Sequence, residues 1–177
     1  MIDISSLHFV LVMGFSSRSI KTSEIEGILM VKQALYLDDL KVGDTFISEK
    51  YQLNAEKIKR FAREFDPQVF HCDENLAKDT FFKGLAASGW HTAAITMKLL
   101  TDSLPFAHGV IGAGGEIKWP QPTRPNDVLY VESTIKEIKP SKSKPNQALL
   151  LVECETLNQR NEVCQILVTK LLSFRKS

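Results

Sequence analysis

Hydrophobic and polar residues change their period several times along the chain, and each change marks an expected element. A Gly-Asp turn at 43–44 leads into residues 45–53, whose bulky and β-branched side chains favour an extended strand. In residues 55–65 the apolar side chains recur at helical spacing, and Asn54 is placed to cap the helix. Pro67 disfavours helical geometry at Asp66, so the helix is expected to end there.

A second, longer helix is expected over residues 88–104, with Ser88 as its N-cap and a short helical turn in residues 73–80 before it. Its side chains are apolar on most sides, which predicts a helix buried in the core. After Pro105 the pattern becomes extended. Four long strands are expected there, in residues 109–119, 127–138, 147–157 and 162–174.

The order of these elements predicts the fold class. A strand and a helix come first, then a loop, a central apolar helix and four antiparallel strands, which indicates an α+β fold with a helix on one sheet face. A single curled antiparallel sheet wrapped around the long apolar helix accommodates every segment. This architecture is the hotdog fold, and we expect one hotdog domain over residues 35–177.

Residues 1–34 do not share this pattern and are expected to form a flexible N-terminal extension. The apolar stretch at 7–15 follows Asp3 rather than basic residues and lacks a convincing cleavage site, which disfavours a signal peptide. It is also too short to span a bilayer. Met30 precedes a normal domain start, so a second interpretation is that translation begins there.

Composition and charge exclude several classes of function. At 177 residues, 44% hydrophobic and 24% charged, the chain is long enough for one domain with a real core. A formal charge of +1 gives no electrostatic reason to expect a nucleic-acid partner. Three cysteines, Cys72, Cys154 and Cys164, form no CxxC pair and have no zinc-type spacing. Buried free thiols in a reducing cytoplasm, without a structural metal, are therefore expected.

Polar groups that can carry chemistry concentrate in residues 65–74, FDPQVFHCDE. Asp66 and His71 lie five positions apart among aromatic and aliphatic neighbours, Asp73 follows, and Ser88 and Gly89 open the apolar helix. This set resembles the signature of the MaoC-like dehydratases, the family that includes the (R)-specific enoyl-CoA hydratases. The resemblance extends from residue 35 to the C-terminus and implies a hotdog enzyme acting on an acyl thioester.

The chain departs from the family pattern at several positions. Proline comes two positions earlier than usual, at Pro67, and Gln68 replaces an asparagine, so the hydrogen bonding of the loop must differ. In the turn within KWPQPTRPNDVL, Asn126 stands where glycine is common, and asparagine tolerates positive φ. Met97 corresponds to a serine close to the thioester in characterised hydratases. Met97 cannot donate a hydrogen bond, and it and Trp90 are interpreted as core residues.

Hydration of an α,β-unsaturated thioester explains why these residue types stand together. A base must take a proton from water and an acid must give one to the α-carbon, and Asp66 and His71 supply both functions. In a desolvated loop their proton affinities depend on each other. Gly89, with Ser88 beside it, offers a backbone N–H at the positive end of a helix dipole for the charge that develops on the thioester oxygen.

Simpler roles stay open for each residue. Asp66 can end a helix, His71 can be a buried structural histidine, and Ser88 can be only an N-cap. Asp73 is as well explained by capping the short helical turn as by supporting the Asp/His pair, and Gln68 by a surface loop as by lining a water site. Neither simple role of Asp66 or His71 accounts for the two residues together with the Ser-Gly pair downstream.

The leading prediction is a lyase of the enoyl-CoA hydratase or acyl dehydratase type, with CoA as the expected carrier. No metal or redox cofactor, nucleic acid or membrane is expected. The resemblance implies a homodimer, because the family closes the open sheet edge of its hotdog domain by dimerising. A hotdog thioesterase is one alternative, although many carry a carboxylate within the central helix, where this chain has none before Asp102. A non-catalytic module that binds acyl thioesters is another. Arg124 could contact a CoA phosphate or be an exposed turn residue.

Overall fold

The computed structural model describes residues 33–176. The expected extension over residues 1–34 lies almost entirely outside the described residues, so it stays a prediction. The described part is anchored from its beginning, because the Leu35 N–H donates to the Pro105 carbonyl at 2.8 Å and Leu35 pairs with Phe106 in an isolated β-bridge.

Residues 33–176 form one six-stranded antiparallel sheet in the order β1-β4-β5-β6-β3, with β2 also paired to β4. The four long strands are confirmed. The strands are β1 (Thr45–Ile47), β2 (Tyr51–Gln52), β3 (Ile111–Lys118), β4 (Val128–Pro140), β5 (Gln147–Leu157) and β6 (Val163–Phe174).

The single strand expected over residues 45–53 is instead two short strands, β1 and β2. Between them the hydroxyl of Ser48 accepts the N–H of Val131 at 2.8 Å, while the Ser48 N–H donates to the Val131 carbonyl at 2.9 Å. A side-chain oxygen therefore replaces a backbone carbonyl in the ladder, and the regular strand is interrupted there.

One face of the sheet supplies the core. Burial alternates with a period of two along β4 and β5, as expected for strands with one covered face. Leu129, Val131, Ile135, Leu150 and Val152 are completely buried on that face. Each contributes roughly 1.5–3 kcal/mol relative to an exposed side chain.

The first predicted helix is confirmed as α2 (Ala55–Phe65). The side chain of Asn54 accepts the Lys57 N–H at 2.9 Å, and the helix ends at its C-cap, Asp66. Three short helical segments accompany it: η1 (Leu37–Asp39), α3 (Val69–Cys72) and η2 (Leu76–Asp79). Of these, α3 was not predicted, while η2 is the expected short turn.

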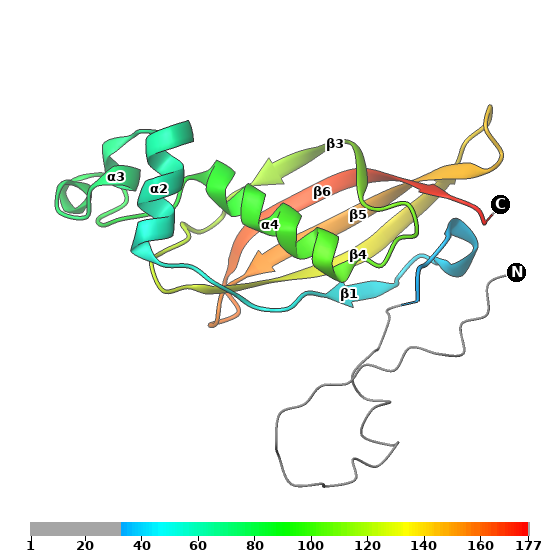
Figure 1. Cartoon of the computed structure of the whole chain (residues 1–177), viewed down its shortest axis with the longest axis horizontal. Helices are drawn as coiled ribbons and strands as arrows, with labels where there is room; N and C mark the ends of the chain where they lie inside the picture. Colours follow the sequence, from blue (N-terminus) through cyan, green and yellow to red (C-terminus); the bar gives the residue numbers. More distant parts are fainter. Residues whose placement is uncertain (1–32, 177) are drawn as a thin grey trace, which may run out of the picture. The chain divides into compact units, whose positions relative to one another are not determined.

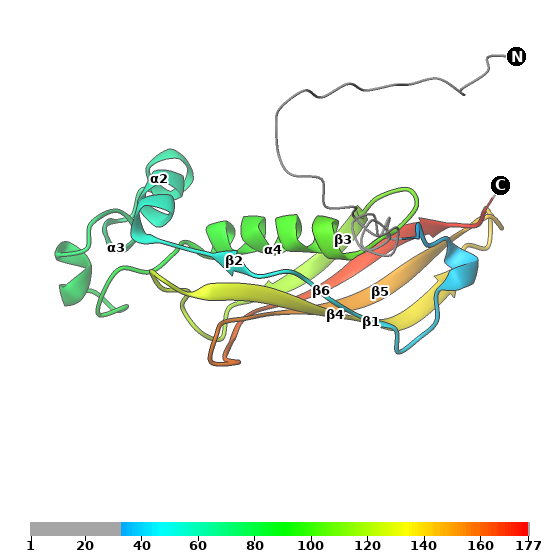
Figure 2. The ribbon, with the colours of Figure 1, turned by 60° about the horizontal axis from the view of Figure 1, so that its bottom comes forward.

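The second predicted helix is α4 (Gly89–Ser103), capped by the Ser88 side chain. In Figures 1 and 2 it lies along the concave face of the sheet, and α2 and α3 lie beyond its N-terminal end. This arrangement confirms the predicted hotdog fold. The expected burial of the helix is confirmed for its inner face, but the interpretation of Trp90 and Met97 as core residues is wrong for the single chain, because Trp90 is 62% and Met97 41% exposed. Both residues lie on the outer face of the helix, where the Trp90 ring meets the Trp119 ring at 5.7 Å, centroid to centroid.

Two further features of the described residues bear on the sequence expectations. No helix among residues 33–176 is long and apolar enough to cross a membrane. All three cysteines are free thiols; Cys154 and Cys164 are buried and Cys72 is half-buried.

Candidate active site

The junction between α2 and α3 brings Asp66 and His71 together. Asp66 ends α2, its carbonyl accepts the Gln68 N–H at 2.8 Å, and the chain turns directly into α3, which carries His71. This reversal places Nε2 of His71 3.5 Å from Oδ2 of Asp66. The two residues of the sequence motif therefore face each other.

The orientation of the His71 ring is fixed by its other nitrogen. Nδ1 lies 2.7 Å from the carbonyl oxygen of Ala86, which can only accept, so Nδ1 carries a hydrogen. In the neutral imidazole Nε2 is then an acceptor and points toward Asp66. The residue is 4% exposed, and Phe70 and Phe82 pack against its ring.

Asp66 is held as a carboxylate. Burial alone would raise its pKa, but side-chain hydrogen bonds from Ser88 and Gln68, together with the electrostatic interaction with His71, outweigh that effect and lower the pKa below its usual value. The Gln68 amide donates to Oδ1 at 2.8 Å. An ionised carboxylate and a neutral Nε2 are both acceptors, so a hydrogen must lie between them. A bound proton or a water molecule can supply it.

Ser88 and Gly89 form the N-terminus of α4 beside this pair. Ser88 is buried at 1% exposure, and its oxygen accepts the Trp90 N–H at 3.2 Å. A side-chain hydrogen bond with Ser88 is one cause of the lowered pKa of Asp66. Gly89 is the first helical residue, and no hydrogen bond from its amide to another group of residues 33–176 is found. A Cβ at this position would lie 2.8 Å from the Trp119 ring. Only glycine allows that approach.

A cavity of about 410 Å³ opens at this helix terminus. His71 and Gly89 form part of its wall, and the remaining wall is mainly aromatic, proline and threonine side chains. The lining residues are His71, Phe81, Phe82, Ala87, Gly89, Thr92, Trp119, Pro120, Gln121, Pro122 and Thr123. The imidazole and a free backbone amide thus meet in one apolar cavity large enough for a short acyl group.

Comparison with known proteins assigns the family. A family model described as a MaoC-like domain matches residues 40–155. The chain belongs to this family. A crystal structure of a MaoC-like dehydratase from Rhodospirillum rubrum is 54% identical, with a TM-score of 0.80 over 81% of this chain and 99% of that one.

Two curated relatives of this MaoC-like protein extend the comparison. The uncharacterised protein YdeM of Bacillus subtilis (strain 168) is 35% identical over 128 residues, covering 70% of this chain and 88% of the relative. The 3-hydroxybutyryl-CoA dehydratase of Methylorubrum extorquens is 27% identical over 117 residues, covering 66% of this chain and 73% of the relative.

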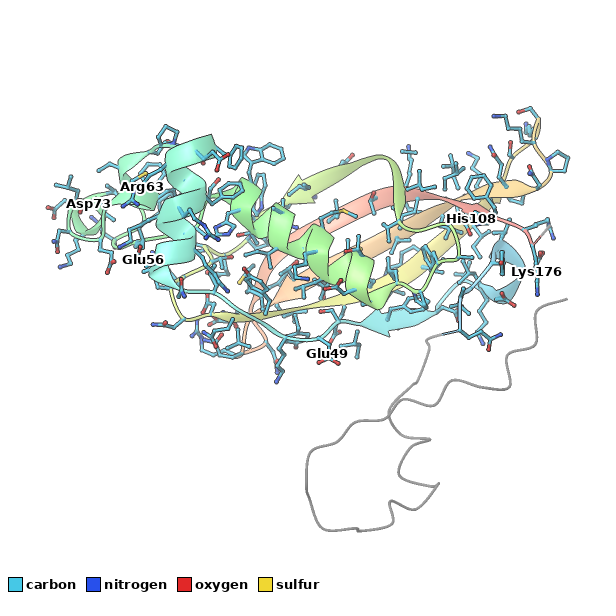
Figure 3. The ribbon with its side chains drawn as sticks, viewed as in Figure 1. Glu49, Glu56, Arg63, Asp73, His108 and Lys176 are labelled. Atoms are coloured by element: carbon cyan, nitrogen blue, oxygen red, sulfur yellow. The ribbon has the colours of Figure 1, made fainter. Side chains whose placement is uncertain are left out.

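Two further predicted residues of the MaoC-like site take different positions. Gln68 lies in the pair's immediate surroundings through its bond to Asp66. Asp73 does not: its Oδ1 accepts the N–H groups of Leu76 and Asn75 at 3.0 and 2.8 Å, and these bonds lower its pKa. Figure 3 shows Asp73 at the outer edge of the helical region, beside α3. Its carboxylate is occupied by the turn that leads to η2.

The sequence did not indicate the cavity position of Trp119 or the backbone contacts of Arg124. The Arg124 guanidinium donates to three backbone carbonyls of the loop after η2, so it is bound to this loop and is not a free turn residue. A contact with a CoA phosphate stays a prediction. Trp119 forms cavity wall and donates from Nε1 to Gln165 at 2.9 Å. In this part of the chain the sequence predicted only the turn, in which Asn126 has a positive φ of 69° as expected.

Within the described residues, the cavity lacks the helix carboxylate expected of a hotdog thioesterase. Asp102, the acidic residue of α4, is near the helix C-terminus and pairs with Lys98 at 2.8 Å. The cavity is at the opposite end of the helix, at Gly89. Among residues 33–176, no three histidine, cysteine or acidic side chains are grouped so that they could hold a metal ion.

Proposed function

We propose that this MaoC-like protein is a hydratase/dehydratase that adds water to, or removes it from, the α,β double bond of an enoyl-CoA. The observation that carries the proposal is the Asp66–His71 pair, 3.5 Å apart, whose His71 lines a cavity together with Gly89. The Rhodospirillum relative is described as a dehydratase and the Methylorubrum relative as a 3-hydroxybutyryl-CoA dehydratase. Both names support this class of reaction.

In the proposed hydration, the hydrogen between the two acceptors belongs to the attacking water. The Asp66 carboxylate and Nε2 of His71 hold this water and take one of its protons as its oxygen bonds to the β-carbon. The pair then gives a proton to the α-carbon, so one water is consumed and no net proton is released. Dehydration is the reverse sequence. The lowered pKa of Asp66 suits it to the base role, because it is ionised at neutral pH.

The thioester oxygen gains negative charge as the α-carbon becomes enolate-like. We assign its stabilisation to the Gly89 N–H at the first turn of α4, where the helix dipole is positive and no side chain blocks approach. Ser88 supports both the helix terminus and the catalytic carboxylate, since it caps α4 and hydrogen-bonds Asp66. Ser88 therefore links the Asp66 carboxylate to the helix terminus that carries Gly89.

Hydrolysis of the thioester is less well supported. A hotdog thioesterase of the type considered from sequence needs a carboxylate within the central helix, and the acidic residue of α4 is distant from the cavity and paired with a lysine. A binding module without turnover would not require an ionised Asp66 opposite His71, nor the hydrogen bond from Nδ1 to Ala86 that fixes the orientation of the His71 ring. Both alternatives predict persistence of the enoyl group.

We also propose that the protein acts as a homodimer in the cytoplasm. The face of α4 with Trp90 and Met97 is exposed, and the edge of β3 away from β6 is unpaired within residues 33–176, so a second copy can cover both. The three free cysteines fit a reducing compartment.

The test is the loss of enoyl absorbance of crotonyl-CoA with the purified protein, beside a thiol-release assay on saturated acyl-CoAs. The proposal predicts absorbance loss that disappears in His71→Gln, with no thiol release. Thiol release without enoyl loss would support a thioesterase. Binding of crotonyl-CoA by both proteins without either reaction would support a binding module.

A further inference from the structure

The side chain of Arg124 hydrogen-bonds the backbone of the loop that follows η2. Its guanidinium donates to the carbonyls of Phe82 at 2.6 Å, Gly84 at 3.0 Å and Leu85 at 3.1 Å. The side chain is half-buried, and these bonds use three of the five N–H donors of the guanidinium. A planar guanidinium can reach several acceptors at fixed angles, which a lysine ammonium on a flexible stem cannot reproduce.

The shape of this loop requires such a donor. Lys83 has a φ of 52° and Gly84 a φ of 145°, both positive, and the backbone turns so that the three carbonyls meet the same guanidinium. Carbonyl oxygens that converge repel one another unless a donor lies between them. Arg124 supplies that donor from a segment about 40 residues later in the chain.

The loop of residues 82–85 continues directly into Ala86, whose carbonyl orients His71. The Ala86 carbonyl accepts the Nδ1 hydrogen at 2.7 Å, and the Ala86 N–H donates back to Phe70 at 3.1 Å. The Phe82 ring lines the cavity and lies 4.9 Å from the Phe70 ring, centroid to centroid. One stretch of backbone thus sets both the tautomer of His71 and part of the cavity wall.

The backbone of Arg124 is fixed by a hydrogen bond to the side chain of Asp127. Oδ2 of the buried Asp127 accepts the Arg124 N–H at 2.7 Å, and Oδ1 of Asp127 accepts from Gln159 at 3.2 Å. The neighbouring Thr123 carbonyl accepts the Ala87 N–H at 2.9 Å. The guanidinium therefore extends from a rigid turn, not from a mobile one.

We propose that Arg124 is a positioning residue for the Asp/His site. It holds residues 82–85 so that the Ala86 carbonyl keeps the hydrogen of His71 on Nδ1 and leaves Nε2 directed to Asp66. The consequence for catalysis rests on the proposed function, whereas the consequence for the tautomer does not. Arg124 touches no reacting atom.

The test compares wild type with Arg124→Ala and Arg124→Lys by ¹⁵N NMR of histidine-labelled protein at about pH 8, where a free imidazole is neutral. The chain has four histidines, and His71→Gln identifies the signal of interest. We expect Nδ1 of His71 to be protonated in wild type and both tautomers to be populated in the variants. Arg160→Ala is the matched control, because Arg160 pairs with Glu162 on an exposed hairpin.

Kinetics on crotonyl-CoA give the second readout. We expect kcat to fall roughly tenfold to a hundredfold in Arg124→Ala, with a smaller change in KM and partial recovery on adding guanidinium ion. A tautomer signal unchanged from wild type in Arg124→Lys would overturn the proposal, and that variant decides if Arg124→Ala does not fold. If wild type has no hydratase activity, the tautomer comparison still tests Arg124 while the proposed function fails.

Discussion

At the residue scale, the site depends on groups that have little freedom to move. The His71 ring is fixed at Nδ1 by Ala86, and Asp66 is fixed by Gln68 and Ser88. The lowered pKa of Asp66 gives stability that is present above the unfolded pKa and is lost as the pH falls through the folded value. The same hydrogen bonds therefore support folding and the base role at neutral pH.

His91 should make stability fall in mild acid. Its Nδ1 is buried without a partner, its ring stacks on Phe61, and burial, with Arg60 and Lys57 nearby, lowers its pKa to about 4. As the pH drops from about 6.5 to about 4, the unfolded chain binds a proton that the folded chain does not, which costs up to about 3 kcal/mol. His91→Phe should retain the stacking and remove this loss.

Urea unfolding of wild type and His91→Phe at several pH values from 4 to 8 measures this difference. The two free energies should diverge below about pH 6.5, with the variant more stable. Equal pH dependence in both proteins would show that folding does not lower the pKa of His91.

Gly89→Ala should damage both the fold and the site. The added methyl would lie 2.8 Å from the Trp119 ring, which its bond to Gln165 prevents from withdrawing easily. We expect a loss of about 1–3 kcal/mol in unfolding free energy and a clear drop in kcat/KM, because Gly89 also lines the cavity. Gly112→Ala is the control, since its methyl would meet nothing within 4 Å. Unchanged activity in Gly89→Ala would exclude the assigned oxyanion site.

At the element scale, α4 is the element that connects core and site. Its inner face, with Ile95, Leu99 and Leu100, packs into the core, and its N-terminus presents Ser88 and Gly89. Its outer face is exposed and partly apolar, which is an unusual state for a central helix. Whether a second copy covers this face, as proposed, is therefore the main question at this scale.

Met97→Glu should prevent self-association. Met97 is 41% exposed on the outer face of α4, and a carboxylate buried there in a dimer would be left without a partner. Sedimentation velocity should give a dimer for wild type and a monomer for the variant. Lys78→Glu, an exposed change outside α4, should leave the dimer intact. A wild-type monomer would contradict the proposed homodimer.

Elements with strong local patterns could be predicted from the sequence, and others could not. Both long helices begin at the expected caps, Asn54 and Ser88, because capping is local chemistry. The helix α3 is too short to show a period, and the break after β1 depends on a Ser48 hydroxyl bonded to the distant β4.

The same distinction applies to the candidate site. Asp66 and His71 are close in sequence and chemically distinctive, so their pairing could be predicted. The acceptor that orients His71 is a backbone carbonyl, which every residue has, and Arg124 reaches its loop across about 40 residues. No local pattern in the chain encodes either contact.

At the scale of the whole molecule, the core of the described domain lies between Leu37 and Leu171. If residues 1–29 form the flexible extension that the sequence predicts, a chain that starts at Met30 should unfold at the same temperature as the full chain and keep its activity. A chain that starts at Val42 should be less stable, because it lacks the buried Leu37 and Leu40, each worth roughly 1.5–3 kcal/mol. Thermal unfolding of the three chains tests this, and a large loss in the first would mean that residues 1–29 contribute to the domain.

The central claim is that Asp66 and His71 hydrate an enoyl thioester as one unit. Its most direct test is kcat/KM for crotonyl-CoA in wild type, Asp66→Asn, His71→Gln and the double variant. We predict that each single change lowers kcat/KM by about a hundredfold or more and that the double variant is no worse than the poorer single one. Losses that multiply in the double variant, or an active Asp66→Asn protein, would contradict the account.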